Sequence, residues 1–268
     1  MQQHGNQRLR NVAAHVLQPR RAAAAAALPP PPQPPLPPHT TVPRFPVGSA
    51  EAREYLETHG FCVCAGALNP AECSEVIAGM WGYLEVLGTG IRRAEPNTWC
   101  DANWPDKTGV GLMCNAGVTH TDWAWRVRGH PNVIAAWSSV LDLPASELIA
   151  SLDCLSMFRP WALAQAEPSW RTRGAWWHSD QTVESKVNEL GQEVGGTHRE
   201  YVQGFVTVVP TSEESGGFAV VSGSHLRFAE LDGEENKAAR EAACATGIIP
   251  ALQQGDLLVR PHHHFLTS

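Results

Sequence analysis

The order of two hydrophobic patterns along the chain constrains its fold more than any other feature. Between residues 50 and 150, apolar side chains recur at helical spacing, whereas from Leu152 onward short apolar or β-branched segments alternate with glycine-rich turns. These spacings are typical of helices and of strands, respectively. A run of helices followed by many short strands indicates a mainly β fold with flanking helices, such as a β-barrel or jelly roll.

Three helices are expected before the strands. The first covers residues 51–59. The second begins after Asn69, because Asn at the N-cap, Pro70 at the first helical position and Glu72 two residues later form a typical helix start. The third begins at Pro131. Strands are expected in the following segments: 152–158, 176–183, 201–209, 218–221 and from 257 onward.

The first 50 residues differ in composition from the rest. They contain 11 of the 21 prolines, five of the 20 basic residues and none of the 27 acidic residues. A tract such as 29–38 favours polyproline II and cannot form a packed core. Two interpretations stay open, an organelle transit peptide or a disordered tail. We expect this tail to cover 1–48 and one folded domain to cover 49–268, helical over 49–150 and β over 151–268.

Charge, hydropathy and cysteine content indicate which binding partners and which cellular compartment to expect for this protein. The formal net charge is −7, which favours neither nucleic acid nor an anionic membrane as a partner. No apolar run approaches the ~20 residues that span a bilayer, and nothing resembles a secretory signal. The seven cysteines include no CxxC pair, so we expect reduced thiols in an intracellular protein of the cytoplasm or an organelle. The oligomeric state is not predicted.

One short motif carries chemistry, His178-Ser179-Asp180. Residues two apart in a strand point to the same face, so His178 and Asp180 would present an imidazole and a carboxylate side by side. One more His from a distant strand would complete a facial triad, which leaves open positions on Fe(II) for O2 and a chelating co-substrate. A second copy, His120 to Asp122, lies where a helix could start and is more simply a helix cap.

Three further segments follow the His-x-Asp motif in a fixed order. They are Tyr201-Val202-Gln203-Gly204-Phe205-Val206, Ser215-Gly216-Gly217-Phe218-Ala219-Val220-Val221-Ser222-Gly223-Ser224-His225 and Gly255-Asp256-Leu257-Leu258-Val259. Together with His178-Ser179-Asp180, this order resembles the phytanoyl-CoA dioxygenase family. The likeness covers about residues 50–259, and the four motifs in order are more specific than any one alone.

The resemblance implies a double-stranded β-helix of jelly-roll or cupin-like type that holds Fe(II). It implies 2-oxoglutarate and O2 as co-substrates, with hydroxylation of a small organic or lipid-derived molecule. His178 and Asp180 match the proximal metal ligands, and His225 matches a structural loop position. Gln181 and Gln203 are candidate polar groups lining the co-substrate site.

The C-terminal segment departs from the family pattern. The register of the family's distal His falls on Leu266, and the Arg expected to grip the far carboxylate of 2-oxoglutarate would lie beyond Ser268. We therefore expect the last strand or strands to be missing, His264 to be the nearest substitute ligand, and turnover to be weak. Three explanations stay open: a truncated or mis-spliced product, a pseudoenzyme, or a register shift onto His264. The rival function is a non-catalytic barrel that binds a ligand or a partner protein.

Overall fold

A computed structural model describes residues 36–106, 111–113, 117–150, 152, 154–163, 166–171, 177–180, 202–212, 215–261 and 265–267. The chain divides into two units, Met1–Gln33 and Pro34–Ser268. All of the described residues belong to the second unit. Residues 1–35 of the expected transit peptide or disordered tail, which was set at 1–48, lie outside the described residues.

Six α-helices are present in the described part of the chain: α2 (Ala50–His59), α3 (Pro70–Val86), α4 (Asp122–Arg128), α5 (Pro131–Leu141), α6 (Phe228–Leu231) and α7 (Lys237–Cys244). Short 3-10 helices are η1 (Pro96–Trp99), η2 (Val118–His120), η3 (Ala145–Glu147), η4 (Pro168–Trp170), η5 (Ser224–Arg227) and η6 (Glu234–Asn236). The three helices expected from the sequence correspond to α2, α3 and α5. The start of α3 has the expected capping box, with Asn69 and Glu72 each accepting a backbone N–H of the other.

Ten short strands are described: β1 (His39–Thr40), β2 (Phe45–Pro46), β3 (Cys62–Ala65), β4 (Leu112–Met113), β5 (Leu155–Ser156), β6 (Val202–Val206), β7 (Ala219–Val220), β8 (Ile249–Pro250), β9 (Leu257–Pro261) and β10 (Leu266–Thr267). The largest sheet has the order β2-β3-β9-β6. In it, β9 runs antiparallel to both β3 and β6, and β2 runs parallel to β3. The structure therefore has the expected mixture of helices and short strands, but β1 to β3 lie before or among the first helices, and α6 and α7 follow β7.

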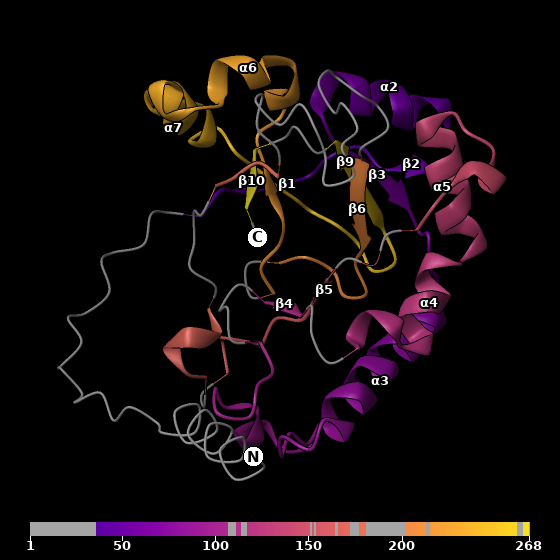
Figure 1. Ribbon diagram of the computed structural model, residues 1–268, viewed down its shortest axis with the longest axis vertical. Coiled ribbons are helices and arrows are strands. Elements are labelled where there is room, and N and C mark those ends of the chain that lie inside the picture. The colour runs from indigo at the N-terminus through magenta and orange to yellow at the C-terminus, as the bar shows by residue number, and fades with distance from the viewer. Residues whose placement is uncertain are drawn as a thin grey trace, which may run out of the picture. The chain divides into compact units, whose positions relative to one another are not determined.

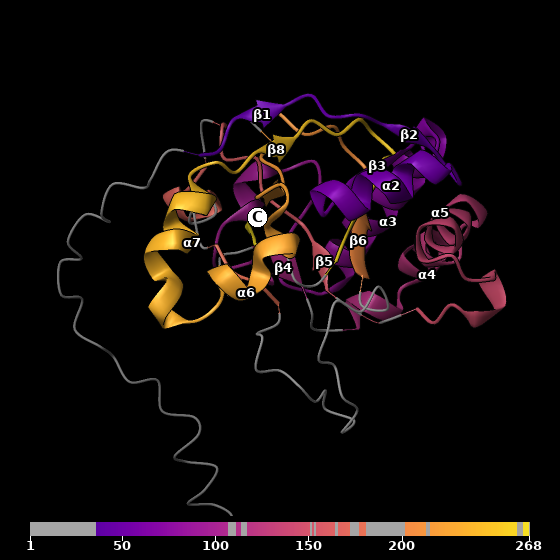
Figure 2. The ribbon, with the colours of Figure 1, turned by 90° about the horizontal axis from the view of Figure 1, so that it is seen from above.

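Both faces of the central strand β9 are buried. Leu257 and Val259 pack on one side against apolar residues of α2 and α5, such as Leu56 and Val133. Leu258 points to the opposite side, because side chains alternate along a strand, and it packs in a separate cluster. In Figures 1 and 2, α2 and α5 lie beside β2 and β3, whereas α6 and α7 lie at the other end of the described fold. Arg260, the next residue of β9, is therefore also buried.

Three two-stranded pairings complete the β structure. Strand β1 pairs with β8, β4 with β5, and β7 with β10. Leu266 of β10 is opposite Val220 of β7 and also forms an antiparallel bridge with His178. The C-terminal segment therefore joins β7 to the His-x-Asp segment.

The folded part begins earlier than the expected boundary at residue 49. Strands β1 and β2 both precede that residue, and each pairs within the described fold. Arg44 also binds Asp256 through two hydrogen bonds of 2.7 and 2.8 Å. The proline-rich composition misplaced the boundary, because proline is tolerated in short edge strands. Pro46 is such a residue, at the edge of the largest sheet.

The strands are shorter than the sequence segments that predicted them. Segment 152–158 yields only β5, and 201–209 yields β6. Strand β3 was not predicted, although its residues 62–64 are fully buried. The expectation of reduced thiols fails at Cys154, which is disulfide-bonded. The other described cysteines are free: Cys62, Cys64, Cys73, Cys100 and Cys244.

Candidate metal centre

His178 and Asp180 lie on an extended segment that β10 holds in place. The backbone N–H of His178 donates to the carbonyl oxygen of Leu266, and the N–H of Leu266 donates back, both at 3.0 Å. Residues two apart on such a segment share a face. Accordingly, Nε2 of His178 lies 3.5 Å from Oδ1 of Asp180. The structure therefore brings together the two side chains that the sequence singled out.

Arg260 on β9 is the third member of this cluster. It lies directly opposite Gln203 of β6 in the sheet register, and its guanidinium donates to Oε1 of Gln203. The same guanidinium nitrogen donates to Oδ2 of Asp180 at 2.6 Å. Arg260 is only 8% exposed and its guanidinium carbon lies 5.6 Å from the ring centre of Phe218. The cluster is therefore partly shielded from water.

The electrostatics of the cluster keep Asp180 ionised. Burial by itself would raise the pKa of Asp180, but the hydrogen bond with His178 and the positive charge of Arg260 outweigh burial. The pKa of Asp180 is consequently held well below its ordinary value. A carboxylate ligand must be ionised to bind a metal, and this one is ionised at any physiological pH.

The donors of this cluster fit a divalent transition metal. Imidazole and carboxylate are both suitable ligands for iron. Their facing atoms, 3.5 Å apart, can both reach one ion because each metal–ligand bond is about 2 Å long. Oδ2 of Asp180 is engaged by Arg260, so Oδ1 is the oxygen that faces His178. Two of the donors that a facial triad needs are therefore in place.

The third donor is not among the described residues. Within them, no three His, Cys, Asp or Glu side chains form a group that could hold a metal. Opposite His178, on the same face of the bridge, stands the buried and apolar Leu266. His264 and Gln181, both predicted to belong to the site, lie outside the described residues. Gln203 lies beside the cluster, where its side chain accepts from Arg260.

The other histidines of interest have structural positions, as expected. His120 ends η2, and Asp122 is the first residue of α4, so the second His-x-Asp copy marks a helix start. His225 donates from Nε2 to the carbonyl oxygen of Glu57 at 2.9 Å, which ties η5 to α2. Neither the His120 to Asp122 segment nor His225 contributes to the cluster around Asp180.

Sequence reasoning did not place Arg260 in the site. A signal was present in the sequence. Arg260 continues the apolar run 257–259, and a charged residue in a buried strand requires a partner of opposite charge. The carboxylate of Asp180 meets that requirement, although it is 80 residues away. The sequence could not give the pairing of β9 with β6 that fixes the position of Arg260.

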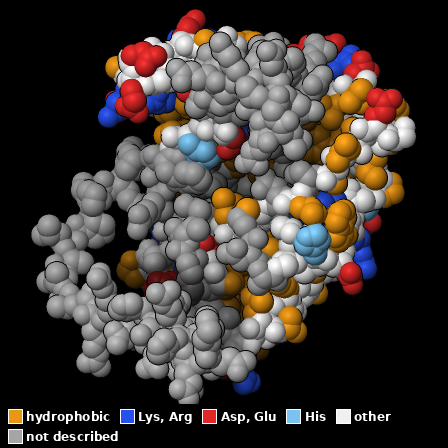
Figure 3. Space-filling view, viewed as in Figure 1, with side chains coloured by type: hydrophobic (Ala, Val, Ile, Leu, Met, Phe, Trp, Pro, Cys, Tyr) orange, Lys and Arg blue, Asp and Glu red, His pale blue; other side chains and the backbone are white. Residues whose placement is uncertain are grey.

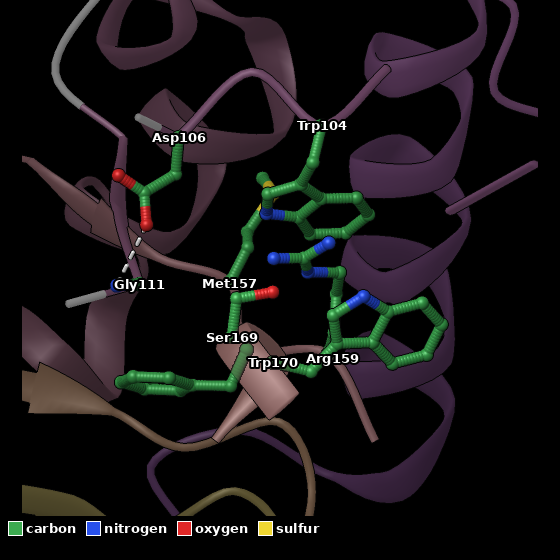
Figure 4. Close-up of a pocket in the computed structure, with 8 residues that line it drawn as sticks. Trp104, Asp106, Gly111, Met157, Arg159, Ser169 and Trp170 are labelled. Atoms are coloured by element: carbon green, nitrogen blue, oxygen red, sulfur yellow. Dashed lines mark hydrogen bonds between the residues drawn. The ribbon is translucent and has the colours of Figure 1, made fainter. Parts of the chain in front are cut away.

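A separate small pocket lies among the loops and short strands (Figure 4). It is lined by Trp104, Asp106, Gly111, Met157, Phe158, Arg159, Ser169 and Trp170. The guanidinium of Arg159 lies between the rings of Trp104 and Trp170, at 5.2 and 5.0 Å from their centres. It is also paired with Asp101 at 2.7 Å. Arg159 therefore stabilises the packing of the loops, and its charge is already balanced.

Several apolar side chains are exposed on the face seen in Figure 3, in the area where Figure 1 places β5, β6 and α4. Among the described residues, the exposed apolar side chains include Phe205 and Phe158, with 36% and 42% of their surface exposed. Exposed apolar side chains are common on protein surfaces and do not by themselves identify a substrate. Among the described helices, none has the length and apolar character needed to cross a bilayer.

This chain is similar to several solved structures. AviO1 from Streptomyces viridochromogenes matches with a TM-score of 0.50 and 17% identity, over 81% of this chain and 85% of that chain. GlcNAc Inducible Gene 2 from Candida albicans matches with a TM-score of 0.54 and 9% identity, over 84% and 62%. HygX from Streptomyces hygroscopicus, solved with nickel and 2-oxoglutarate bound, gives a TM-score of 0.48 and 15% identity, over 81% and 79%.

The sequence itself gives the family. No curated protein shows a significant match to this chain. The family model for phytanoyl-CoA dioxygenase matches residues 56–264, which include β3, the His178 to Asp180 segment and β9. This match covers most of the chain and contains the motifs described above. The chain belongs to the phytanoyl-CoA dioxygenase (PhyH) family of oxidoreductases.

Proposed function

We propose that this chain is a dioxygenase that uses Fe(II), 2-oxoglutarate and O2 to hydroxylate a small organic or lipid-derived molecule. The observation that carries the proposal is the approach of Nε2 of His178 to Oδ1 of Asp180, 3.5 Å apart on one extended segment. Family membership supports the same chemistry. The bound iron would supply O2 activation, coupled to decarboxylation of 2-oxoglutarate.

The chain's own residues would bind and orient the reactants. His178 and Asp180 are the proposed proximal ligands, and His264 is the proposed third ligand. Gln181 and Gln203 are proposed to line the co-substrate site, and the amide nitrogen of Gln203 can donate to an anionic group while its oxygen accepts from Arg260. The proposed scaffold is a double-stranded β-helix, with β9 and β6 on one side of the site and β7 and β10 on another.

The rival proposal is a non-catalytic barrel that binds a ligand or a partner protein. One observation favours it: Leu266 occupies the position opposite His178 where the family pattern places a ligand. Metal binding separates the two proposals. A chain that binds no metal at His178 and Asp180 would be a binding module and not an oxygenase.

The first prediction tests the metal ligands. The full chain should bind Mn(II), a redox-stable substitute for Fe(II), and the double variant H178A/D180A should lose affinity by more than about 100-fold, because even outer-shell substitutions cost about 10–100-fold. The matched control is H120A/D122A, which removes the same two residue types from the second His-x-Asp copy. Isothermal titration of the three proteins provides the measurement.

The outcomes of this titration are distinct. Equal affinity in the full chain and in H178A/D180A would refute the assignment. Loss of affinity in the H120A/D122A control as well would point to a general effect on folding. Succinate formation from 2-oxoglutarate with Fe(II) and ascorbate then tests the activity, which should disappear in H178A/D180A.

A further inference from the structure

In the metal-free protein, the carboxylate of Asp180 is already paired with a cation, the guanidinium of Arg260. Oδ2 accepts from Arg260 at 2.6 Å, whereas Oδ1 faces His178. Asp180 has only 25% of its side chain exposed. A carboxylate that is partly shielded from water is stabilised by a positive partner, so the metal-free fold gains from a cation at this position. Arg260 meets that need.

Arg260 is held in place by contacts other than Asp180. Its position opposite Gln203 is fixed by the β6–β9 register, and Oε1 of Gln203 accepts from the same nitrogen that binds Asp180. Phe218 lies against the guanidinium at 5.6 Å, close enough for a cation–π contact. The strand therefore presents a permanent positive charge to the carboxylate, because Arg stays protonated at all relevant pH values.

We infer that Arg260 is a built-in counter-cation for Asp180 that competes with the metal. This inference rests on the proposed function and concerns regulation of the same site. Arg260 balances Asp180 in the metal-free protein, so the fold does not require metal. A divalent ion that binds Oδ1 must share the carboxylate with the guanidinium and is repelled by it, because like charges at this range interact strongly in a partly buried site. Arg260 thus lowers metal affinity while it stabilises the metal-free state.

Two substitutions of Arg260 separate charge from shape. R260Q removes the charge and keeps a polar side chain that can reach Gln203, whereas R260K keeps the charge on a side chain of similar length. We expect R260Q to bind Mn(II) about tenfold more tightly or better than the full chain, and R260K to stay within about threefold of it. Mn(II) should also raise the melting temperature of R260Q more than that of the full chain, because only R260Q has an unbalanced Asp180 without metal.

Each result of this experiment has a defined meaning. If R260Q is unfolded without metal, Mn(II) should restore its near-UV circular dichroism, and failure to do so would overturn the inference. If the full chain binds Mn(II) and R260Q binds it equally or more weakly, Arg260 only orients Asp180 and the competition is refuted, while the proposed metal centre stands. If neither protein binds Mn(II), the metal centre fails and the inference fails with it.

Discussion

At the scale of single residues, Asp256 is the most completely buried charged group among the described residues. It is 0% exposed and accepts four hydrogen bonds: two from Arg44, one from the N–H of Gly66 and one from the N–H of Gln253. A buried carboxylate persists only when its oxygens are paired. This aspartate belongs to the Gly-Asp-Leu motif that supported the family resemblance. The Asp of this motif therefore has a structural role, because Asp256 joins the start of β9 to Arg44 in the segment before α2.

The second prediction follows from this ion pair. R44M should lower the free energy of unfolding by about 3–5 kcal/mol, because the charge of Asp256 then stays buried without a cation. D256N in the R44M background should recover part of the loss, since the neutral amide can still accept from Gly66 and Gln253. Urea unfolding of the two single variants and the double variant gives the coupling energy. Strict additivity of the single effects would show that the pair is not coupled.

At the scale of elements, the sequence predicted α2, α3 and α5 but not α6 or α7, and it predicted the strands less well. The start of α3 was readable because its determinants are local: Asn69, Pro70 and Glu72 are neighbours in sequence. Strand β3 depends instead on its pairing with β9, almost 200 residues later. Local propensity holds no information about such a partner, so a four-residue strand between two helices was missed.

The third prediction concerns the N-terminus of α3. Glu72 accepts from the backbone of Asn69 at 2.7 Å and contacts Nε2 of His130 at 3.1 Å, and these interactions lower its pKa, the backbone contact most. A carboxylate with a depressed folded pKa stabilises the fold above its unfolded pKa and loses that effect as the pH falls. Between about pH 6 and pH 3, the free energy of unfolding should therefore fall less in E72Q than in the full chain.

The matched control for this pH series is E54Q, which makes the same substitution at an exposed position of α2. E54Q should keep the pH dependence of the full chain. Urea unfolding at several pH values measures the difference. If E72Q and the full chain show the same slope, Glu72 does not contribute to the acid sensitivity of the fold.

At the scale of the whole molecule, the sequence singled out His178, Asp180 and Gln203 of the candidate cluster but not Arg260. His178 and Asp180 could be identified because their spacing of two along one strand is visible in the sequence. Arg260 was missed because its place depends on the β6–β9 pairing, and the outcome for His264 and Gln181 lies outside the described residues. The domain boundary was set from composition, which does not reveal that residues 39–46 pair with β8 and β3.

The fourth prediction tests that boundary. Removal of residues 1–48 should lower the melting temperature by roughly 10 °C or more, because β1, β2 and the Arg44–Asp256 pair are lost together and each kcal/mol corresponds to about 2–4 °C in a chain of this size. Removal of residues 1–35 leaves all of these contacts in place and should have a smaller effect. Thermal unfolding of the two shortened proteins gives the comparison. Equal melting temperatures would show that the segment before α2 does not stabilise the fold.

The central position of β9 also determines when the protein can fold during its synthesis. Strand β3 ends at Ala65, and its partner β9 is complete only at Pro261. The ribosome needs roughly 10–40 s to make the intervening segment at about 5–20 residues per second. Throughout that interval the apolar side chains of 61–64 lack the strand that buries them. The β3–β9 pairing therefore cannot form until β9 has been made, and the exposed apolar segment can aggregate until then.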